Sequence, residues 1–266
     1  MTEYVGMAMP RYDGVGQVKG QTKFVDDFVL PGMLYAKAVR SPVHKGVIRK
    51  VDTSAAEKIP GVVGFVMPKD IPGARFHGAC GDQPVLADEF ISYKGEDLAL
   101  VVAVDEDTCQ EALEAVKLDI EEQEPVFDMY KAMEPDAPLV RPTLKSNVWE
   151  YEPGMTTRVL YVGDVEQGLA EADHIVEGKY RTGEQDHAAM EPMVSVAHFD
   201  DAGRLAIHTH SQCLYFQLGQ LAAIFDLPLS QIRYIGGTVG GGFGGKNHIH
   251  ADHFAGLAAI KFRRPV

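Results

Sequence analysis

Residues 236–246 form the stretch of this sequence that is best suited to binding a ligand. Seven of these eleven residues are glycine. Glycine accepts φ > 0 and has no Cβ, so such a loop can turn sharply and bring bare N–H groups against a ligand. A strand-like run, 231–235, precedes the loop, and a helical pattern follows it, with Phe254, Leu257 and Ala258 on one face. The N-terminus of that helix would add N–H donors and partial positive charge, which suits phosphate or an oxo ligand.

Two nucleotide-binding patterns overlap this loop, and neither is complete. Gly240-x-Gly242-x-x-Gly245 fits the dinucleotide fingerprint, but the acidic residue expected about 20 positions later is missing. The same stretch up to Lys246 fits a Walker A sequence, but Asn247 stands where Ser or Thr should bind Mg²⁺. A tight loop that lets a helix pack closely on a sheet is the structural alternative, and it stays open on these residues alone.

Histidines and a cysteine near the loop are further candidates for chemistry. His250 and His253 share a helical face, with His248 close by, but no zinc pattern with a matching third ligand is present. We therefore expect surface histidines and no metal bound by protein side chains. Cys213 has no obvious base nearby and is expected to be a small buried apolar residue.

Composition excludes several classes of protein. The 266 residues are 45% apolar and 24% charged, which is typical of a folded soluble protein. The net charge of −13 argues against nucleic acid and an anionic membrane surface as partners. No apolar run is long enough for a transmembrane helix, and no signal peptide is visible. The three cysteines are scattered, without disulfide, zinc or iron–sulfur spacing, so we expect a cytoplasmic location.

The first half of the sequence predicts a compact unit of strands and helices. Strands are expected at 33–39, 62–66, 98–104 and 118–120, with a short helix at 55–59. The unbroken apolar run 98–104 is typical of a strand buried on both faces. Asp105 or Asp107 can cap the helix after it, whose apolar face carries Cys109, Ala112, Leu113 and Val116. Residues 67–90, rich in Gly, Pro and Asp, are expected to be irregular.

The second half predicts another mixed unit after a linker. Residues 131–160 contain four prolines and little periodicity. Beyond them the patterns predict a helix at 165–172 capped by Asp164, a strand at 174–182, a hairpin of 193–199 with 205–209, and a helix at 214–225. We therefore expect an α+β fold in three parts: residues 1–130, a linker at 131–160, and residues 161–266.

The sequence resembles the molybdenum hydroxylases, the family of xanthine dehydrogenase and aldehyde oxidase. In that family a loop like Gly-Gly-Gly-Phe-Gly-Gly-Lys, at 240–246 here, lies against the molybdopterin cofactor. Other matches follow in family order: Val18-Lys19-Gly20, 27–35, Arg40-Ser41-Pro42, 61–63, 93–96, 163–165, 186–192 and Ser211-Gln212. The resemblance implies an α/β hammerhead domain at 1–130 and the first part of a molybdopterin-binding domain at 161–266.

The resemblance also implies which residues lie beside the cofactor. Gln212 matches a glutamine that hydrogen-bonds an oxygen ligand of molybdenum, and capping of the next helix is the alternative role. Backbone groups of Phe243 and Gly244 match contacts beside the metal. Gly241 and Gly242 match the neighbouring wall of the loop.

Three further positions carry expectations from the same resemblance. Asn247 matches a position that faces substrate, where purine-oxidising members typically carry glutamate; an ordinary polar residue at a helix start is the alternative. His187 and Glu191 match a family motif and are expected to be exposed or paired polar residues. Arg263 stands where glycine is common, so we expect the left-handed helix stop to be lost.

The implied function is that of one component of a molybdenum-dependent hydroxylase. Such an enzyme oxidises an aldehyde or an N-heteroaromatic substrate with water as the oxygen source. Family chains continue beyond the matched region and carry their catalytic glutamate there, so no catalytic residue is expected here, and this chain alone should be inactive. The implied partners are the remaining molybdopterin-domain segment or subunit, an iron–sulfur subunit, an FAD subunit and a small-molecule substrate. The alternative is a truncated, non-catalytic remnant that binds no cofactor and at most interacts with partner subunits.

Overall fold

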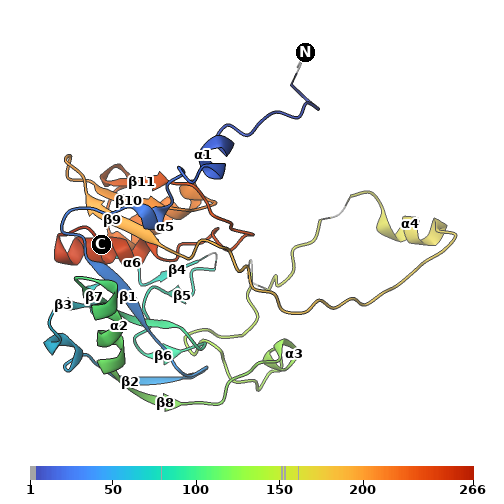
Figure 1. Ribbon diagram of the computed structural model, residues 1–266. Helices are drawn as coiled ribbons and strands as arrows, with labels where there is room; N and C mark the ends of the chain where they lie inside the picture. The colour runs from blue at the N-terminus through green and yellow to red at the C-terminus, as the bar shows by residue number, and fades with distance from the viewer. Residues whose placement is uncertain (1–3, 79, 151, 153, 161) are drawn as a thin grey trace. The chain divides into compact units, whose positions relative to one another are not determined.

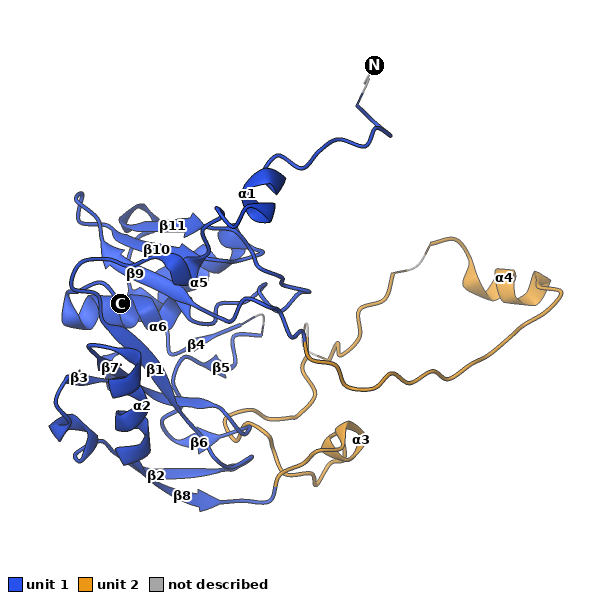
Figure 2. Cartoon of the chain, viewed as in Figure 1, with its two compact units in different colours: residues 1–124, 187–266 blue, residues 125–186 orange. Residues whose placement is uncertain are grey.

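The computed structural model describes residues 4–78, 80–150, 152, 154–160 and 162–266. These residues fall into two compact units (Figure 2). The first unit combines residues 1–124 with residues 187–266, and the second is 125–186. The mixture of helices and strands confirms the α+β class (Figure 1). The boundaries expected at 130 and 160 remain a prediction.

The N-terminal part of the first unit contains two three-stranded antiparallel sheets and one short strand pair. The first sheet is β1 (Tyr35–Arg40), β7 (Asp97–Ala103) and β3 (Val62–Val66), with β7 in the centre. The second is β6 (Phe90–Ile91), β2 (Gly46–Asp52) and β8 (Lys117–Glu122), with β2 in the centre. The short pair is β4 (Phe76–His77) with β5 (Gln83–Pro84). Strand β2 was not predicted from the sequence, and β4 and β5 lie in the stretch expected to be irregular.

The central strand β7 holds this part together. Residues 98–103 are all fully buried, which confirms the strand predicted to be covered on both faces. Helix α2 (Glu106–Ala115) covers one face with Cys109 and Ala112. Its N-cap is Asp105, whose side chain accepts a hydrogen bond from the N–H of Thr108 at 2.7 Å, so the first of the two predicted caps is the one used.

The C-terminal part of the first unit is a three-stranded sheet with two helices. Strands β9 (Ser195–Phe199) and β10 (Leu205–Thr209) form the predicted hairpin, and β11 (Ile232–Gly236) pairs with β10 in parallel. Helix α5 (Leu214–Phe225), which confirms the helix predicted at 214–225, supplies the crossover between the two parallel strands. Helix α6 (Asp252–Phe262) packs against β9 and β10.

One hydrophobic core joins the two parts of the first unit. It contains Leu100 and Val102 of β7, Ile207 of β10 and buried residues of both helices. Gly256 of α6 faces the ring of Phe225 so closely that a Cβ there would overlap it. The helices can therefore approach each other only because this position is glycine.

The C-terminus of α6 corrects one expectation. Arg263 itself adopts the left-handed conformation, with φ 54° and ψ 35°, and closes the helix by donating its N–H to Ala259. Its guanidinium lies over the ring of Phe199, 4.7 Å from the centroid. The helix stop is therefore kept without glycine.

Short helical segments complete the first unit: α1 (Gly14–Val18), η1 (Val25–Asp27), η2 (Ala56–Lys58), η3 (Pro68–Asp70) and η4 (Leu229–Gln231). The helix expected at 55–59 is the single turn η2. Within the described residues, no helix has the length and hydropathy needed to span a bilayer.

The second unit, 125–186, contains α3 (Met129–Ala132) and α4 (Val165–Glu171). Asp164 caps α4 by accepting from the N–H of Gln167, as predicted. The strand expected at 174–182 is wrong, since these residues are exposed and extended without strand pairing. Among the described residues, the named strands all belong to the first unit. The described part of the second unit therefore offers no strand with which residues 174–182 could pair.

Candidate functional site

The glycine loop leaves the sheet at the end of β11. The N–H of Gly237 donates to the carbonyl of Thr209 on β10 at 2.7 Å, which anchors the start of the loop. Further on, Gly241 and Gly244 have φ values of 93° and 89°, and Phe243 between them has φ 53° with its side chain 75% exposed. The left-handed conformation costs a non-glycine residue about 1–2 kcal/mol, so the loop holds Phe243 in a strained, outward position.

Three other glycines of the loop are needed for packing and not for a left-handed backbone. Side chains from other segments contact them closely, where a larger residue would have its Cβ. A Cβ at these positions would overlap a neighbour in each case: Glu191 at Gly240, Gln212 at Gly242 and His187 at Gly245. The high glycine content therefore lets polar side chains pack directly on the loop. Close packing of a helix, the structural alternative, explains only Gly236, against which Leu214 of α5 lies.

Gln212 is bound to the glycine loop through both its backbone and its side chain. Its N–H donates to the carbonyl of Lys246 at 2.9 Å. Its side-chain Oε1 accepts from the N–H groups of Gly244 and Lys246, each at 3.2 Å. Two donors at one end determine which amide atom is the oxygen, so the Nε2 end is the one that can donate to a ligand. The alternative role is not seen, since the N-cap of α5 is Cys213 and no side chain caps it.

The loop also presents backbone donors. Among the described residues, the N–H groups of Gly241, Gly242 and Phe243 make no hydrogen bond within the protein. Successive N–H groups in a turn with alternating backbone conformation form a concavity that suits anionic or oxo groups. The helix N-terminus beside this loop is that of α5, which starts directly after Gln212 and Cys213. The helix after the loop, α6, begins only at Asp252. The sequence-based expectation that this helix supplies the positive dipole end beside the loop is therefore wrong, and α5 supplies it.

A buried ion pair between Lys246 and Glu191 fixes the glycine loop. Lys246 Nζ lies 2.7 Å from Glu191 Oε2, with the two side chains 1% and 5% exposed. The same carboxylate oxygen accepts from the N–H of Gly240 at 2.7 Å, and the N–H of Glu191 donates to the carbonyl of Gly240 at 3.0 Å. The expectation of exposed or paired polar residues is confirmed for both, since Glu191 is paired and His187 is exposed. Lys246 belongs to the motif that the sequence shows, but no role for it was predicted.

A buried polar network continues from the ion pair to helix α6. Gln217 donates through Nε2 to the carbonyls of Lys246 at 3.2 Å and His248 at 2.8 Å, and its Oε1 accepts from Tyr234 at 2.6 Å. The hydroxyl of Tyr234 also lies 3.0 Å from Asp252 Oδ1, so the oxygens of Gln217 and Asp252 share its single hydrogen. Burial, together with Asp252, raises the pKa of the Tyr234 hydroxyl, which therefore stays protonated and can donate. Sequence reasoning missed this network, because the three residues occupy ordinary positions on separate elements.

Asn247 lies at the same site as Gln212. Its N–H donates to the carbonyl of Gly244 at 3.3 Å, and its Oδ1 accepts from the thiol of Cys213 at 3.5 Å. Cys213 is exposed, so the expectation of a buried apolar cysteine is wrong. It stands at the N-cap position of α5.

The histidines near α6 are less exposed than expected. His253 is 3% exposed, and burial, with His77 and His250 nearby, holds its pKa well below the usual range. His250 is half-buried, with Nε2 2.6 Å from the carbonyl of Gly245. Only His248 is exposed among the three. Within the described residues no group of three or more His, Cys, Asp or Glu side chains is arranged to hold a metal ion.

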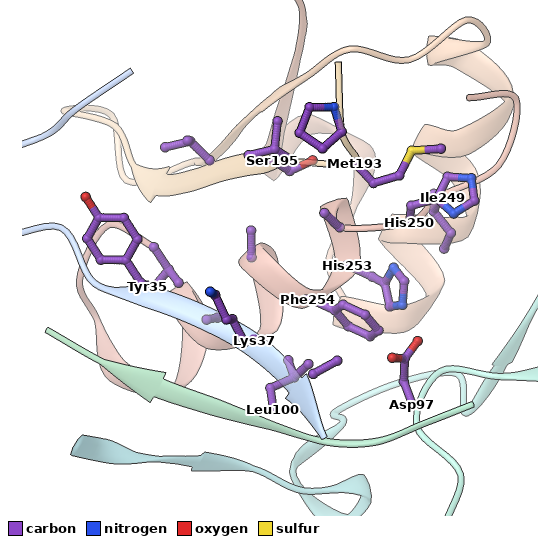
Figure 3. Close-up of a pocket in the computed structure, with 18 of the residues that line it drawn as sticks. Tyr35, Lys37, Asp97, Leu100, Met193, Ser195, Ile249, His250, His253 and Phe254 are labelled. Atoms are coloured by element: carbon purple, nitrogen blue, oxygen red, sulfur yellow. The ribbon is translucent and has the colours of Figure 1, made fainter. Parts of the chain in front are cut away.

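A cavity of about 810 Å³ lies elsewhere in the first unit, lined by β1, β9 and the start of α6 (Figure 3). Neither Gln212, Asn247 nor the loop residues 240–246 line it. The predicted site, formed by the loop and the segment before α5, is therefore separate from this cavity.

Comparison with known proteins agrees with this arrangement. Residues 19–124 match the model of the α/β hammerhead domain of aldehyde oxidase and xanthine dehydrogenase, and residues 148–266 match that of the molybdopterin cofactor-binding domain. A hammerhead domain followed by cofactor-binding sequence defines a molybdopterin-binding chain. The chain belongs to the molybdenum hydroxylase family that contains xanthine dehydrogenase and aldehyde oxidase.

Individual relatives support the same assignment. The chain is 36% identical to a probable xanthine dehydrogenase subunit from Bacillus subtilis over 96% of its own length, and 32% identical to the nicotinate dehydrogenase large molybdopterin subunit of Eubacterium barkeri over 99%. It spans 33% and 60% of these two relatives. The aldehyde oxidoreductase of Desulfovibrio gigas has the same fold, with a TM-score of 0.83 and 29% identity over 97% of this chain and 29% of that one.

Proposed function

We propose that this chain forms part of the cofactor site of a molybdenum-dependent hydroxylase, which oxidises an aldehyde or an N-heteroaromatic compound with water as the oxygen source. Gln212 and the backbone of 241–244 would contact the cofactor, and Asn247 would contact the substrate. The rest of the molybdopterin-binding domain, the iron–sulfur clusters and FAD would come from partner segments or chains. The relative from Eubacterium barkeri is named a large molybdopterin subunit, which supports such a division.

The observation that carries this proposal is the orientation of the Gln212 amide. The loop donates to its oxygen from two backbone groups, so Nε2 remains as a neutral donor beside the donors of Gly241, Gly242 and Phe243. A molybdenum cofactor presents oxygen atoms, on its phosphate and on the metal, which are acceptors. The donor set of the loop therefore fits the cofactor.

The protein groups have a positioning and electrostatic role. When bound, the cofactor supplies the two-electron oxidation of the substrate. The loop binds and orients it through donors held in advance by the Lys246–Glu191 pair and by Gln217. Donors that need no reorganisation when charge develops are an effective form of electrostatic stabilisation.

Asn247 supports the N-heteroaromatic branch of the proposal. Its amide offers a donor and an acceptor, which suits a ring nitrogen next to a carbonyl, and it is held 3.5 Å from Cys213 beside Gln212. Relatives of this chain are named for nicotinate and xanthine, both of which are N-heteroaromatic compounds. An Asn247→Ala variant of the assembled enzyme should raise KM for the ring substrate more than for an aldehyde.

The test of the proposal is a pair of variants at Gln212 in the chain co-expressed with its partners. Gln212→Glu keeps an acceptor for the loop N–H groups but loses the Nε2 donor, whereas Gln212→Ala loses both. We expect both variants to fold and to lose about 10- to 100-fold in turnover or molybdenum affinity, as outer-sphere variants of metal sites do. Unchanged molybdenum content and turnover in both variants would refute the role of Gln212. An assembly of wild-type chains without any molybdenum would favour the non-catalytic alternative.

The three cysteines are free thiols, which supports the expectation of a reducing, cytoplasmic environment. That location stays a prediction.

A further inference from the structure

The edge of β9 carries backbone groups that point away from its sheet. Ala197 and Val266 exchange two backbone hydrogen bonds, N–H of Ala197 to Val266 at 2.8 Å and N–H of Val266 to Ala197 at 2.9 Å. The backbone groups of Ala197 therefore face away from β10, and those of Ser195, two residues along, face the same way. Thr209, opposite Ser195, uses its carbonyl to accept from Gly237 on the far side, which agrees with this alternation.

The edge of β1 is open in the same manner. This strand lies at the end of the sheet β1-β7-β3, so only one of its sides is paired. The N–H of Leu34, just before the strand, donates to the carbonyl of Pro265 at 2.8 Å, away from β7. By alternation the backbone groups of Ala36 and Ala38 face the same side. Residues 265–266 thus bond to Leu34, just before β1, on one side and to Ala197 of β9 on the other.

The cavity of about 810 Å³ lies between these two edges (Figure 3). Figure 3 shows Tyr35 and Lys37 on β1, Ser195 near β9, and Phe254 of α6 between the two strands. The lining includes residues 34–38, which run into β1, residues 192–196, which run into β9, and Val266. Two facing strand edges with a cavity between them, already bridged at one end by residues 265–266, form a site for one more strand.

We propose that this cavity binds an extended strand of the polypeptide that completes the molybdopterin-binding domain, paired with β9 and β1 at once. The identity of this partner rests on the proposed function. The strand would carry apolar residues at alternate positions facing α6, because the side chain of Val266, at the head of the same path, is buried in the core cluster that contains α6. Its other face would be polar, since Lys37 and Glu106 form an ion pair of 3.2 Å in the cavity lining.

The test uses the purified chain and overlapping synthetic peptides of about ten residues, the length of a strand. The peptides tile the part of the Bacillus subtilis relative that lies outside its match to this chain, which spans only 33% of that relative. Binding is measured by fluorescence anisotropy, and backbone protection by hydrogen exchange. We expect at least one peptide to bind and to slow exchange at least about tenfold at both 34–40 and 193–197. Exchange in β2 and β8 should not change.

Two controls separate backbone pairing from simple apolar adhesion. The same peptide with N-methyl groups on the amides that face the strand edges should bind at least about tenfold more weakly, since it lacks the donors. Ala38→Pro removes an N–H that faces the cavity and should weaken binding similarly, whereas Ala38→Ser keeps the N–H and should not. If Ala38→Pro fails to fold, the N-methylated peptide still shows whether binding depends on backbone hydrogen bonds.

Three results would overturn the proposal: no peptide that protects both edges, equal binding of the methylated peptide, or protection that depends on protein concentration alone. The last would mean that a second copy of this chain covers the edges. The experiment needs no molybdenum, so its failure leaves the Gln212 test untouched. Conversely, a strand that binds here while the Gln212 variants behave as wild type would refute only the cofactor role.

Discussion

Replacement of Lys246 by methionine should destabilise the first unit far more than the loss of an ordinary ion pair. Lys246 and Glu191 are 1% and 5% exposed, so Lys246→Met leaves a carboxylate buried with only the N–H of Gly240 as partner at that oxygen. Removal of one partner of a buried pair costs about 3–5 kcal/mol. For a chain of this size this corresponds to a fall in Tm of roughly 6–20 °C.

The matched control is Lys50→Met. Lys50 Nζ lies 2.8 Å from Asp52, nearly the same distance as in the buried pair, but the two side chains are 64% and 31% exposed. Solvent screens this pair, so we expect Lys50→Met to lower the stability far less than Lys246→Met. The two variants differ mainly in burial, which isolates the cost of leaving a charge without a partner in the interior.

The assay is thermal and urea unfolding of both variants, followed by circular dichroism, with Glu191→Gln and the double variant Lys246→Met/Glu191→Gln to complete a cycle. The double variant should lose less than the sum of the single losses, with a coupling free energy of about 0.5–3 kcal/mol. A loss below about 1 kcal/mol for Lys246→Met, or strict additivity in the cycle, would refute the view that this pair supports the loop.

Two further predictions concern the loop and the response to pH. Gly240→Ala should lower stability more than Gly242→Ala, measured by urea unfolding, because its new methyl would lie 2.5 Å from Cβ of Glu191, whereas at Gly242 it meets the movable amide of Gln212. The free energy of unfolding should fall as the pH drops below about 6.5, since burial depresses the pKa of His253 and the unfolded chain then binds a proton that the folded chain does not. Denaturation at several pH values should show this slope, and a His253→Asn variant should reduce it.

The sequence predicts the elements whose signals are local. The apolar run 98–104, the cap at Asp105 and the hairpin pattern of 193–199 with 205–209 each specify their own structure, and β7, α2 and the β9–β10 hairpin appear as expected. Strand β2 was missed because Arg49 and Lys50 interrupt its apolar alternation. Its backbone pairing with β8, which is distant in the sequence, stabilises the strand although the local pattern is weak. In the segment 174–182 the local pattern favours a strand, but no strand forms because no strand in the described part of the chain pairs with it.

The site shows the same division. The glycine loop, Gln212 and Asn247 are visible in the sequence, and the structure brings them together. Their support is not visible, because Glu191, Gln217 and Lys246 meet from segments up to 55 positions apart. Burial makes these polar residues important, and no local pattern reports burial.

Lys246 connects the glycine loop and Gln212 to the buried residues Glu191 and Gln217. Its ammonium pairs with Glu191, its N–H donates to the oxygen of Gln212, and its carbonyl accepts from both the N–H of Gln212 and the amide of Gln217. A shift of Lys246 would therefore move the amide of Gln212 and the strained backbone around Phe243 together. The lysine at the end of the glycine motif, which in a nucleotide-binding loop would reach a phosphate, is here directed into the protein and holds the loop in shape.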